Sequence, residues 1–177
     1  IGVFSFYATK LMTSGGQGGM IVSKNKSLID SIRDYRQFDC RNDKKNRFNF
    51  QMTDLQAAIG LVQLQRVDKF LEKREIVFQT YVDAGLDILY QNYDSSIQPV
   101  RFRALLNVKN QSKTIQTLKN YGIASIIPIE KWELLDDCVS YPNAEKWCGQ
   151  LVSLPCYPDL TQNSIERITK TIKESGQ

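Results

Sequence analysis

Short apolar runs separated by turn residues open the chain. Residues 1–5 and 20–23 are two such runs, and glycines lie between them. Runs of this length bounded by turn residues are typical of buried strands, and the glycines predict a tight connection. Ser27 and Asp30 have the spacing of a capped helix start, so we expect a helix after the second strand. Strand, turn and helix in succession indicate an α/β layer arrangement.

The strongest helical pattern begins at Thr53. Thr53 and Gln56 have the spacing of a capping box, and Asp54 suits the positive end of the helix dipole. Apolar residues then recur near the helical period, at Leu55, Ile59, Val62, Val67, Phe70 and Leu71. The pattern predicts one helix from Thr53 to about Tyr81, long enough to bridge two domains, and Gly85 marks the boundary that follows.

The second half of the chain mixes short strand and helix patterns. Strands are expected at 100–108, 123–127 and 151–154, and helices at 113–121, at 143–149 and from Thr161 onward. Gly122 suits a left-handed C-cap position, and Pro155 and Pro158 break the last strand. The final helix places Ile165, Ile168 and Ile172 on one stripe. A small α+β domain is therefore expected in this half.

Composition and charge narrow the class of protein. The chain has 177 residues, 42% hydrophobic and 24% charged, which is enough for a core in one domain or slightly more. Its net charge of +4 is too small and too evenly spread for an electrostatic nucleic-acid binder. No apolar run approaches the roughly 20 residues of a membrane-spanning helix, and the first residues lack a signal-peptide pattern. We therefore expect no membrane partner and a cytoplasmic location.

The absence of histidine, the spacing of the cysteines and one cluster of basic residues limit the kinds of site that the chain can form. The chain has no histidine, which excludes imidazole bases, Ser-His triads and most zinc sites, so no metal site is expected. The cysteines form no Cys-x-x-Cys pair and are interpreted as free thiols: Cys40, Cys138, Cys148 and Cys156. A basic cluster is interpreted as a solvated loop, with anion binding as the alternative: Arg41, Lys44, Lys45 and Arg47.

Lys10 is the leading candidate for chemistry. It follows the first apolar run and precedes a glycine-rich turn that spans residues 15–19. Such an arrangement presents an amine to a carbonyl compound, and lysine is the residue type that forms Schiff bases with these compounds. Pyridoxal phosphate is the commonest partner for that chemistry. The alternative is a solvated lysine at a strand end, and for an isolated residue that interpretation would be preferred.

Four sequence segments, taken in their order along the chain, add to the evidence from Lys10. They are Phe4-Ser5-Phe6-Tyr7-Ala8-Thr9-Lys10, then Gly18-Gly19-Met20-Ile21-Val22, then Asn49-Phe50-Gln51-Met52-Thr53-Asp54-Leu55-Gln56, and near the end Val152-Ser153-Leu154-Pro155-Cys156-Tyr157-Pro158. With these segments the chain resembles the sugar aminotransferases of the DegT/DnrJ/EryC1/StrS family. The resemblance covers essentially the whole chain but only the later part of the family's fold. Since Ile1 lies nine residues before Lys10, we expect a C-terminal part of a longer enzyme.

The resemblance implies a fold class and a domain organisation. The class is α/β, namely the end of the large domain of a fold type I, aspartate-aminotransferase-like transferase, followed by a small C-terminal α+β domain. Residues 1–51 would end the domain that binds pyridoxal phosphate, 52–84 would be the long connecting helix, and 85–177 would form the small domain. A homodimer with active sites shared across the interface is also implied.

The resemblance assigns roles to four residues. It implies that Lys10 binds pyridoxal phosphate covalently and later moves a proton between the substrate carbon and the cofactor. Ser5 would donate a hydrogen bond to the cofactor phosphate, Asn49 would reach the phosphate in the neighbouring subunit, and Tyr7 would line the same pocket. The alternatives are a strand serine bonded to nearby backbone for Ser5, a helix-entry turn residue for Asn49 and a core aromatic for Tyr7.

Some residues depart from the family's pattern. Gln17 stands where an acidic residue is usual, and Gln51 stands where arginine is frequent, so both departures remove charge. Glu130 and Trp132 lie in a proline-containing stretch where many relatives carry a histidine, close to the entrance for the sugar nucleotide. Stacking on a base or sugar face is one role for Trp132, and a partly buried structural tryptophan is the alternative.

Two classes of function follow. The first is a pyridoxal-phosphate-dependent aminotransferase that moves an amino group, with glutamate as the expected donor, onto a nucleotide-linked keto-sugar. Retention of Lys10 favours this class over the family's dehydratase relatives, which replace that residue. The second is a chain that is catalytically incompetent without the segment that precedes it in the family, and that serves as a dimerisation or interaction module. A nucleic-acid-binding regulator is disfavoured by the weak charge.

Overall fold

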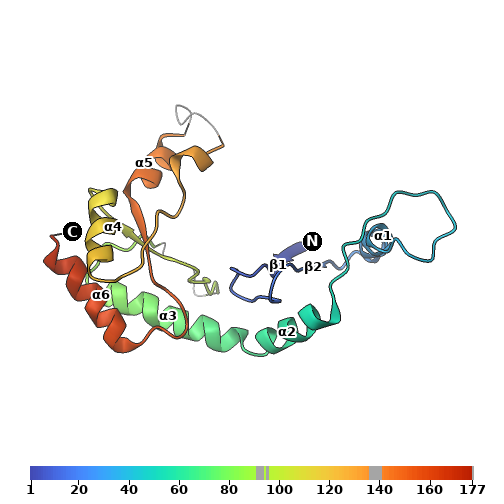
Figure 1. Ribbon diagram of the computed structural model, residues 1–177, viewed down its shortest axis with the longest axis horizontal. Helices are drawn as coiled ribbons and strands as arrows, with labels where there is room; N and C mark the ends of the chain where they lie inside the picture. Colours follow the sequence, from blue (N-terminus) through green and yellow to red (C-terminus); the bar gives the residue numbers. More distant parts are fainter. Residues whose placement is uncertain (91–93, 95, 136–140, 177) are drawn as a thin grey trace. The chain divides into compact units, whose positions relative to one another are not determined.

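The protein divides into two compact units along the chain. The computed structural model describes residues 1–90, 94, 96–135 and 141–176. The first unit is Ile1–Asp68 and the second is Lys69–Gln177. Figure 1 shows the elements of each unit in chain order. The domain boundaries implied by the family resemblance, at 51/52 and 84/85, stay a prediction.

A β-hairpin and two helices make up the first unit. β1 (Gly2–Ser5) pairs antiparallel with β2 (Gly19–Val22), so that Gly2 lies opposite Val22 and Ser5 lies opposite Gly19. Helix α1 (Lys26–Arg36) follows the hairpin, and α2 (Asp54–Leu64) follows a long connection. The two strands and the helix expected after them are therefore confirmed.

The start of α1 differs from the prediction by two residues. The N-cap is Asn25, whose side chain accepts a hydrogen bond from the Leu28 N–H, and not Ser27. The Ser27 hydroxyl donates to Asn25 Oδ1 at 2.9 Å instead. Asparagine is as good an N-cap as serine, so the earlier of two competent residues takes the position.

The predicted burial of the two hairpin strands is wrong. The exposed fractions of Val3, Phe4 and Met20 are 74%, 52% and 51%. β1 and β2 form a two-stranded sheet of their own, so each strand has one unpaired edge within the described residues. A strand is buried only when a second layer covers it, and no pattern within the strand supplies that layer.

The predicted helix from Thr53 to about Tyr81 is in fact two helices. The capping box at its start is confirmed, because the Thr53 hydroxyl accepts from the Gln56 N–H and the Gln56 side chain accepts from the Thr53 N–H. However, α2 ends at Leu64, where the Arg66 N–H donates to Gln63 O at 3.0 Å in a tightened last turn. α3 (Val67–Asp83) then begins, and neither glycine nor proline marks the break.

The second unit is a small sheet with helices packed on it. β3 (Ala104–Asn107) pairs antiparallel with β4 (Leu151–Leu154), and single bridges add Ile88 and Ile126 on either side. The helices are α3, α4 (Gln111–Asn120), α5 (Pro142–Gln150) and α6 (Gln162–Glu174), with a 3₁₀ turn η1 at Lys131–Glu133. The core combines side chains of α3, β3, α4, β4 and α6: Val77, Phe78, Tyr81, Ala104, Leu106, Leu118, Val152, Leu154, Ile165, Ile168 and Ile172.

Most of the predictions for this unit are confirmed. β4 has the expected bounds, Gly122 follows α4 with a φ of +68°, and the Ile165, Ile168 and Ile172 stripe is buried. Two strands are shorter than expected, because the 100–108 pattern yields only β3 and the 123–127 pattern only the bridge at Ile126.

Two further properties concern the whole described chain. Cys40 and Cys156 are free thiols, as predicted. The thiol of Cys148 donates to Ile129 O at 3.1 Å, and Cys138 lies outside the described residues. None of the helices within the described ranges is long and apolar enough to cross a membrane.

Candidate active site around Lys10

Lys10 lies in the connection between β1 and β2, at the end of a tight turn. Its backbone N–H donates to Tyr7 O at 2.9 Å, and the Phe6 N–H donates to Gly18 O at 2.8 Å, which continues the hairpin ladder beyond β1. The Lys10 side chain is exposed and has no hydrogen bond or ion pair with any described residue. The connection therefore presents an amine that is not engaged elsewhere in its unit.

Ser14 fixes the shape of this connection. It is fully buried, and its hydroxyl donates to the carbonyls of Phe6 and Gln17 at 3.2 Å and 3.0 Å. The Ser14 N–H also donates to Phe6 O at 2.9 Å. These bonds join the end of β1 to the glycine turn, so the segment that contains Lys10 is closed at both ends. Sequence reasoning missed Ser14, because its partners are backbone carbonyls.

The glycine turn packs against α2 and the segment that leads into it. Gly15 has a φ of +77°, and a Cβ at that position would lie 2.8 Å from the side chain of Ile59. A Cβ on Gly18 would meet both the Ser14 hydroxyl and the Met52 side chain. Glycine is required at both positions because the backbone comes too close to its neighbours for any side chain. The Lys10 connection and the start of α2 thus form one packed group.

Ser5 and Asn49 each use an acceptor locally and keep their donors free. Ser5 Oγ accepts from the Tyr7 N–H and Asn49 Oδ1 accepts from the Gln51 N–H, both at 3.4 Å. These are the local bonds that the plainer interpretations predicted. The Ser5 hydroxyl hydrogen and the Asn49 amide hydrogens have no acceptor among the described residues. A phosphate ester needs such donors, so the local bonds are compatible with phosphate binding.

The structure brings three of the four candidate residues together. Ser5, Tyr7 and Lys10 all come from the hairpin, and the 43% exposed fraction of Tyr7 contradicts the core-aromatic alternative. Asn49 lies in the segment before α2, and no hydrogen bond joins it to the other three within the described ranges. The Lys10 amine and the Ser5 hydroxyl on one hairpin fit the chemical needs of pyridoxal phosphate, an aldehyde that carries a phosphate. The roles themselves stay predictions.

Asn49 lies between Phe48 and Phe50 in the sequence, and the rings of these two phenylalanines stack on each other. The ring centroids of Phe48 and Phe50 lie 5.4 Å apart with an interplanar angle of 9°, and Tyr35 lies 5.1 Å from Phe48. The Phe48 N–H also donates to Tyr35 O at 3.0 Å. This aromatic cluster fixes the backbone around Asn49 to the end of α1, which sequence reasoning did not foresee.

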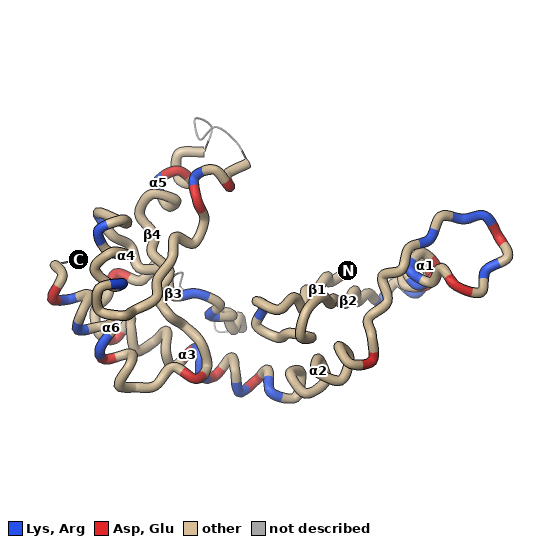
Figure 2. The backbone as a smooth tube through the Cα atoms, viewed as in Figure 1, with Lys and Arg blue, Asp and Glu red and all other residues tan. Residues whose placement is uncertain are grey.

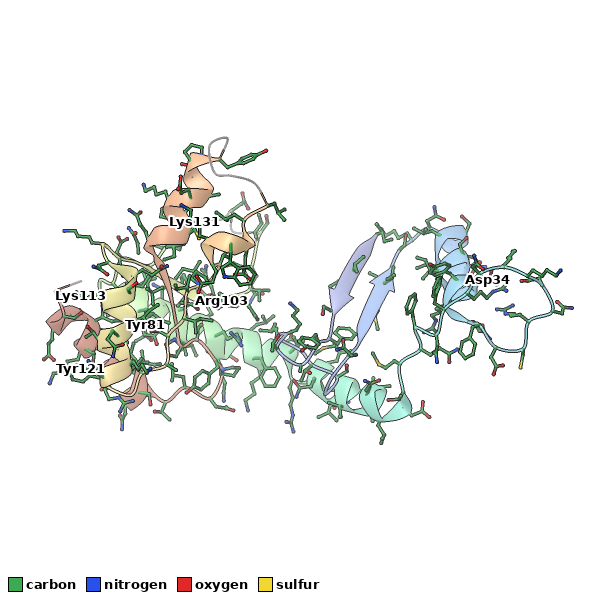
Figure 3. All side chains as sticks on the ribbon, turned by 45° about the horizontal axis from the view of Figure 1, so that its top comes forward. Asp34, Tyr81, Arg103, Lys113, Tyr121 and Lys131 are labelled. Atoms are coloured by element: carbon green, nitrogen blue, oxygen red, sulfur yellow. The ribbon has the colours of Figure 1, made fainter. Side chains whose placement is uncertain are left out.

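Arg47 is not part of a solvated loop, so that prediction is wrong for this residue. Its side chain is only 5% exposed, and it binds Asp34 at 2.9 Å and Asp43 at 2.6 Å. The hydrogen bond from Arg47 holds the pKa of Asp43 well below its usual range. Figure 2 shows the alternating charges of the segment after α1, and Figure 3 labels Asp34. Lys44 is exposed, as expected.

Three of the residues that depart from the family's pattern are exposed, and Glu130 is half-buried. Gln17 and Gln51 are exposed. Trp132 is 81% exposed within η1, so the alternative of a partly buried structural tryptophan is wrong. A nucleotide-facing role for Trp132 stays a prediction.

Comparison with known proteins finds sequence similarity to sugar aminotransferases along almost the whole chain. A sequence model of the DegT/DnrJ/EryC1/StrS aminotransferase family matches residues 1–173. A GDP-perosamine synthase of Vibrio cholerae is 26% identical over 98% of this chain and 52% of its own length. A dTDP-3-amino-3,4,6-trideoxy-alpha-D-glucose transaminase of Micromonospora megalomicea subsp. nigra is 25% identical over 97% of this chain and 51% of its own length.

The fold agrees with a solved structure of the same kind. A sugar aminotransferase of Micromonospora echinospora superposes with a TM-score of 0.81 at 23% identity over 97% of this chain and 51% of its own. The likeness shows that the chain has the α/β fold of the corresponding part of that aminotransferase. The chain spans about half the length of the relatives that it matches.

Proposed function

Because the chain belongs to the DegT/DnrJ/EryC1/StrS aminotransferase family, we propose that it provides the Schiff-base lysine of a pyridoxal-phosphate-dependent sugar aminotransferase. The observation that supports this proposal is the Lys10 connection, in which Ser14 closes a turn that leaves the lysine amine unengaged. An amine that formed an ion pair within its own unit would have to break it before it could react with an aldehyde.

The proposed roles follow from the groups that each residue leaves free. When bound, pyridoxal phosphate supplies the electron sink for bonds at the amino-bearing carbon. Lys10 holds the cofactor through its amine and, once released from it, moves a proton at the substrate carbon. The Ser5 hydroxyl and the Asn49 amide donate to the phosphate, the latter across a subunit interface, and Tyr7 lines the pocket.

The proposed substrates are a nucleotide-linked keto-sugar and glutamate as the amino donor. The names of the Vibrio cholerae and Micromonospora megalomicea relatives, which refer to GDP- and dTDP-linked sugars, support a nucleotide sugar. Glutamate is the expectation from the family resemblance alone.

A homodimer is the proposed assembly, and α2 supports it. Leu55, Leu61 and Leu64 of this helix are 80%, 62% and 54% exposed. A helix that is apolar on all sides is normally buried by protein on all sides. The same surface would serve the alternative function, a dimerisation or interaction module without turnover.

The test is covalent trapping at Lys10. The purified protein is mixed with pyridoxal phosphate and reduced with borohydride, and the added mass is located by peptide mass spectrometry. We expect stoichiometric labelling at Lys10, none in Lys10→Ala and full labelling in Lys24→Ala, a control that removes an exposed lysine next to β2. Scattered or absent labelling would contradict the proposal and favour the interaction module.

A further inference from the structure

The segment 123–127 forms an outer edge of the small sheet. β4 pairs with β3 on one side, and on its other side Ser153 is bridged by Ile126. The Ile126 N–H donates to Ser153 O at 3.3 Å, and the Ser153 N–H donates to Ile126 O at 2.8 Å. In an antiparallel pair, successive residues turn their backbone groups to opposite sides, so those of Ser125 and Ile127 point outward. They have no backbone partner among the described residues.

This open edge is short, which favours one extended peptide over a continuous sheet. Unpaired N–H and C=O groups at a sheet edge bind an added strand through its main chain. Pro128 has no N–H and follows Ile127 directly, so it ends the edge. Gly122, with a φ of +68°, turns the chain at the other end. An added strand would therefore pair with Ser125 and Ile127.

The inner face of this edge is turned toward α6. Val152 and Leu154 are core residues, and side chains alternate along a strand, so Ser153 lies on the outer face of the sheet. Ile126 is bridged to Ser153 and is 54% exposed on the same face. The side chain of Ser125 is therefore on the inner face. Its hydroxyl oxygen is shielded from water and has no hydrogen-bond partner in the described part of the chain, so this side of the edge also holds an unsatisfied polar group.

A cavity of about 400 Å³ lies between the edge and α6. Its apolar wall is formed by three core residues and one residue packed against the core: Ile123, Leu154, Ile168 and Leu160. In a strand added to the edge, every second side chain would point to the inner face and into this cavity. An apolar side chain is the kind that such a wall favours, because its burial removes apolar surface from water.

The mouth of the cavity is positively charged. Among the described residues that line it, Arg167 of α6 is the single charged one. Its exposed guanidinium forms no ion pair with any residue of the described ranges. The adjacent Glu166 lines a different groove, between α6 and α3. The first turn of α6 carries no acidic residue, and a helix N-terminus has a partial positive charge. An acidic group is therefore the complement of this mouth.

We propose that the edge 123–127 and α6 bind an extended peptide segment of a partner protein, in which an apolar residue and an acidic residue lie two positions apart. The main chain of the peptide bonds to Ser125 and Ile127, the apolar side chain fills the cavity, and the carboxylate pairs with Arg167. Residues two positions apart lie on the same face of a strand, so both side chains reach the α6 side. This interaction is independent of the chemistry proposed for Lys10.

The test is fluorescence polarisation with a labelled peptide, Ser-Thr-Leu-Thr-Glu-Ser, whose C-terminus is amidated. We expect Arg167→Glu to weaken its binding about tenfold or more, because a charge-assisted hydrogen bond is lost. A second peptide with lysine in place of glutamate should bind wild type weakly and the Arg167→Glu protein better. A third peptide, methylated on the backbone nitrogens that would face the edge, should lose binding to wild type because main-chain donors are removed.

Lys113→Glu is the matched control for the change of charge. Lys113 is exposed in α4 of the same unit and does not line the cavity (Figure 3). Its replacement should leave the binding of all three peptides unchanged. Circular dichroism verifies that both variants are folded. Since two of the changes are made in the peptide, the comparison on wild-type protein holds even if Arg167→Glu does not fold.

Four results would overturn the proposal. They are no binding of the first peptide by wild type, equal binding by wild type and Arg167→Glu, an equal loss in Lys113→Glu, and undiminished binding of the methylated peptide. Sedimentation equilibrium tests the other occupant, a second copy of this chain. A dimer that the first peptide and Arg167→Glu both dissociate would assign the edge to self-association and refute the assignment to a partner peptide.

Discussion

The hydroxyl of Ser14 occupies the space that a Cβ atom on Gly18 would need. The same hydroxyl donates to the carbonyls of Phe6 and Gln17, so it cannot move without breaking those bonds. The two residues therefore depend on each other: the small residue at 18 allows a serine at 14, and the serine closes the connection around Lys10. The shape of the candidate site is determined by this pair as much as by the lysine itself.

Gly18→Ala should destabilise the first unit and reduce trapping at Lys10. The added methyl group would displace Ser14 or Met52 in a closely packed place, and overpacking of this kind costs about 1–3 kcal/mol. The measurement is the free energy of unfolding in urea, together with the fraction of Lys10 labelled after borohydride reduction.

A matched glycine provides the control for that substitution. A Cβ on Gly60, within α2, would lie 3.9 Å from Ser14 Cβ, an ordinary contact. Gly60→Ala should stabilise the protein by about 0.5–1 kcal/mol because alanine is the better helix former. A Gly18→Ala protein as stable as Gly60→Ala would show that the Ser14 and Gly18 contact does not constrain the connection.

Leu61→Glu should weaken self-association if α2 contributes to a homodimer. Leu61 is 62% exposed, and burying a leucine contributes roughly 1.5–3 kcal/mol, whereas a buried glutamate is unfavourable. Sedimentation equilibrium over a range of protein concentrations measures the dissociation constant. Leu135→Glu is the control, since Leu135 is an exposed leucine that lies in the second unit. A monomeric wild-type protein, or the same shift in both variants, would contradict a role for α2.

Arg47→Met should destabilise the first unit at neutral pH and make its stability less dependent on pH in acid. Arg47 holds the pKa of Asp43 below its usual range, mainly through a side-chain hydrogen bond. A lowered pKa in the folded state gives stability that is present above the ordinary aspartate value, about 3.9, and is lost as the pH falls below it. Urea unfolding at several pH values between neutral and strongly acidic measures this dependence.

Lys44→Met is the control for the acid prediction. Lys44 is exposed in the same segment and takes part in no ion pair with the described residues. Its replacement should leave both the stability at neutral pH and the acid dependence unchanged. Equal behaviour of Arg47→Met and Lys44→Met would mean that the Asp34 and Asp43 contacts contribute nothing to the folded state.

The sequence predicts those parts of the fold that are determined by residues close to one another in the chain. Pro155 ends β4 at the expected residue, and the stripe of Ile165, Ile168 and Ile172 is buried as expected. The break between α2 and α3 has no such cause, because residues 64–67 are all compatible with a helix. The exposure of β1 could not be foreseen either, since burial depends on which other elements cover a strand.

The residues of the candidate site also divide into those that a local sequence pattern or the family resemblance indicates and those that neither indicates. Lys10 was predicted from its local motif and from the family resemblance, and Ser5 and Asn49 from the resemblance alone; the roles of all three stay predictions. Ser14 was missed because its hydroxyl binds carbonyls of the backbone, which any sequence offers.

Tyr81 leads to a prediction at alkaline pH. Its side chain is fully buried, and its hydroxyl donates to Pro155 O at 2.9 Å, which joins α3 to the end of β4. Burial raises the pKa of Tyr81 far above its usual value, with smaller contributions from Cys156 and Tyr157. A raised pKa in the folded state gives stability that is fully present below the ordinary tyrosine value, about 10, and is lost as the pH rises above it.

Tyr81→Phe should therefore lower stability by about 1 kcal/mol at neutral pH, through loss of one buried hydrogen bond, and flatten the decline of stability above pH 10 or so. Urea unfolding at alkaline pH measures the slope, and tyrosinate absorbance shows whether one tyrosine ionises only on unfolding. Tyr121→Phe, which removes a hydroxyl from a 59% exposed ring, should change neither quantity. If Tyr81→Phe retained the wild-type slope, the buried hydroxyl would not be the group that limits alkaline stability, and ionisation elsewhere in the second unit would have to explain it.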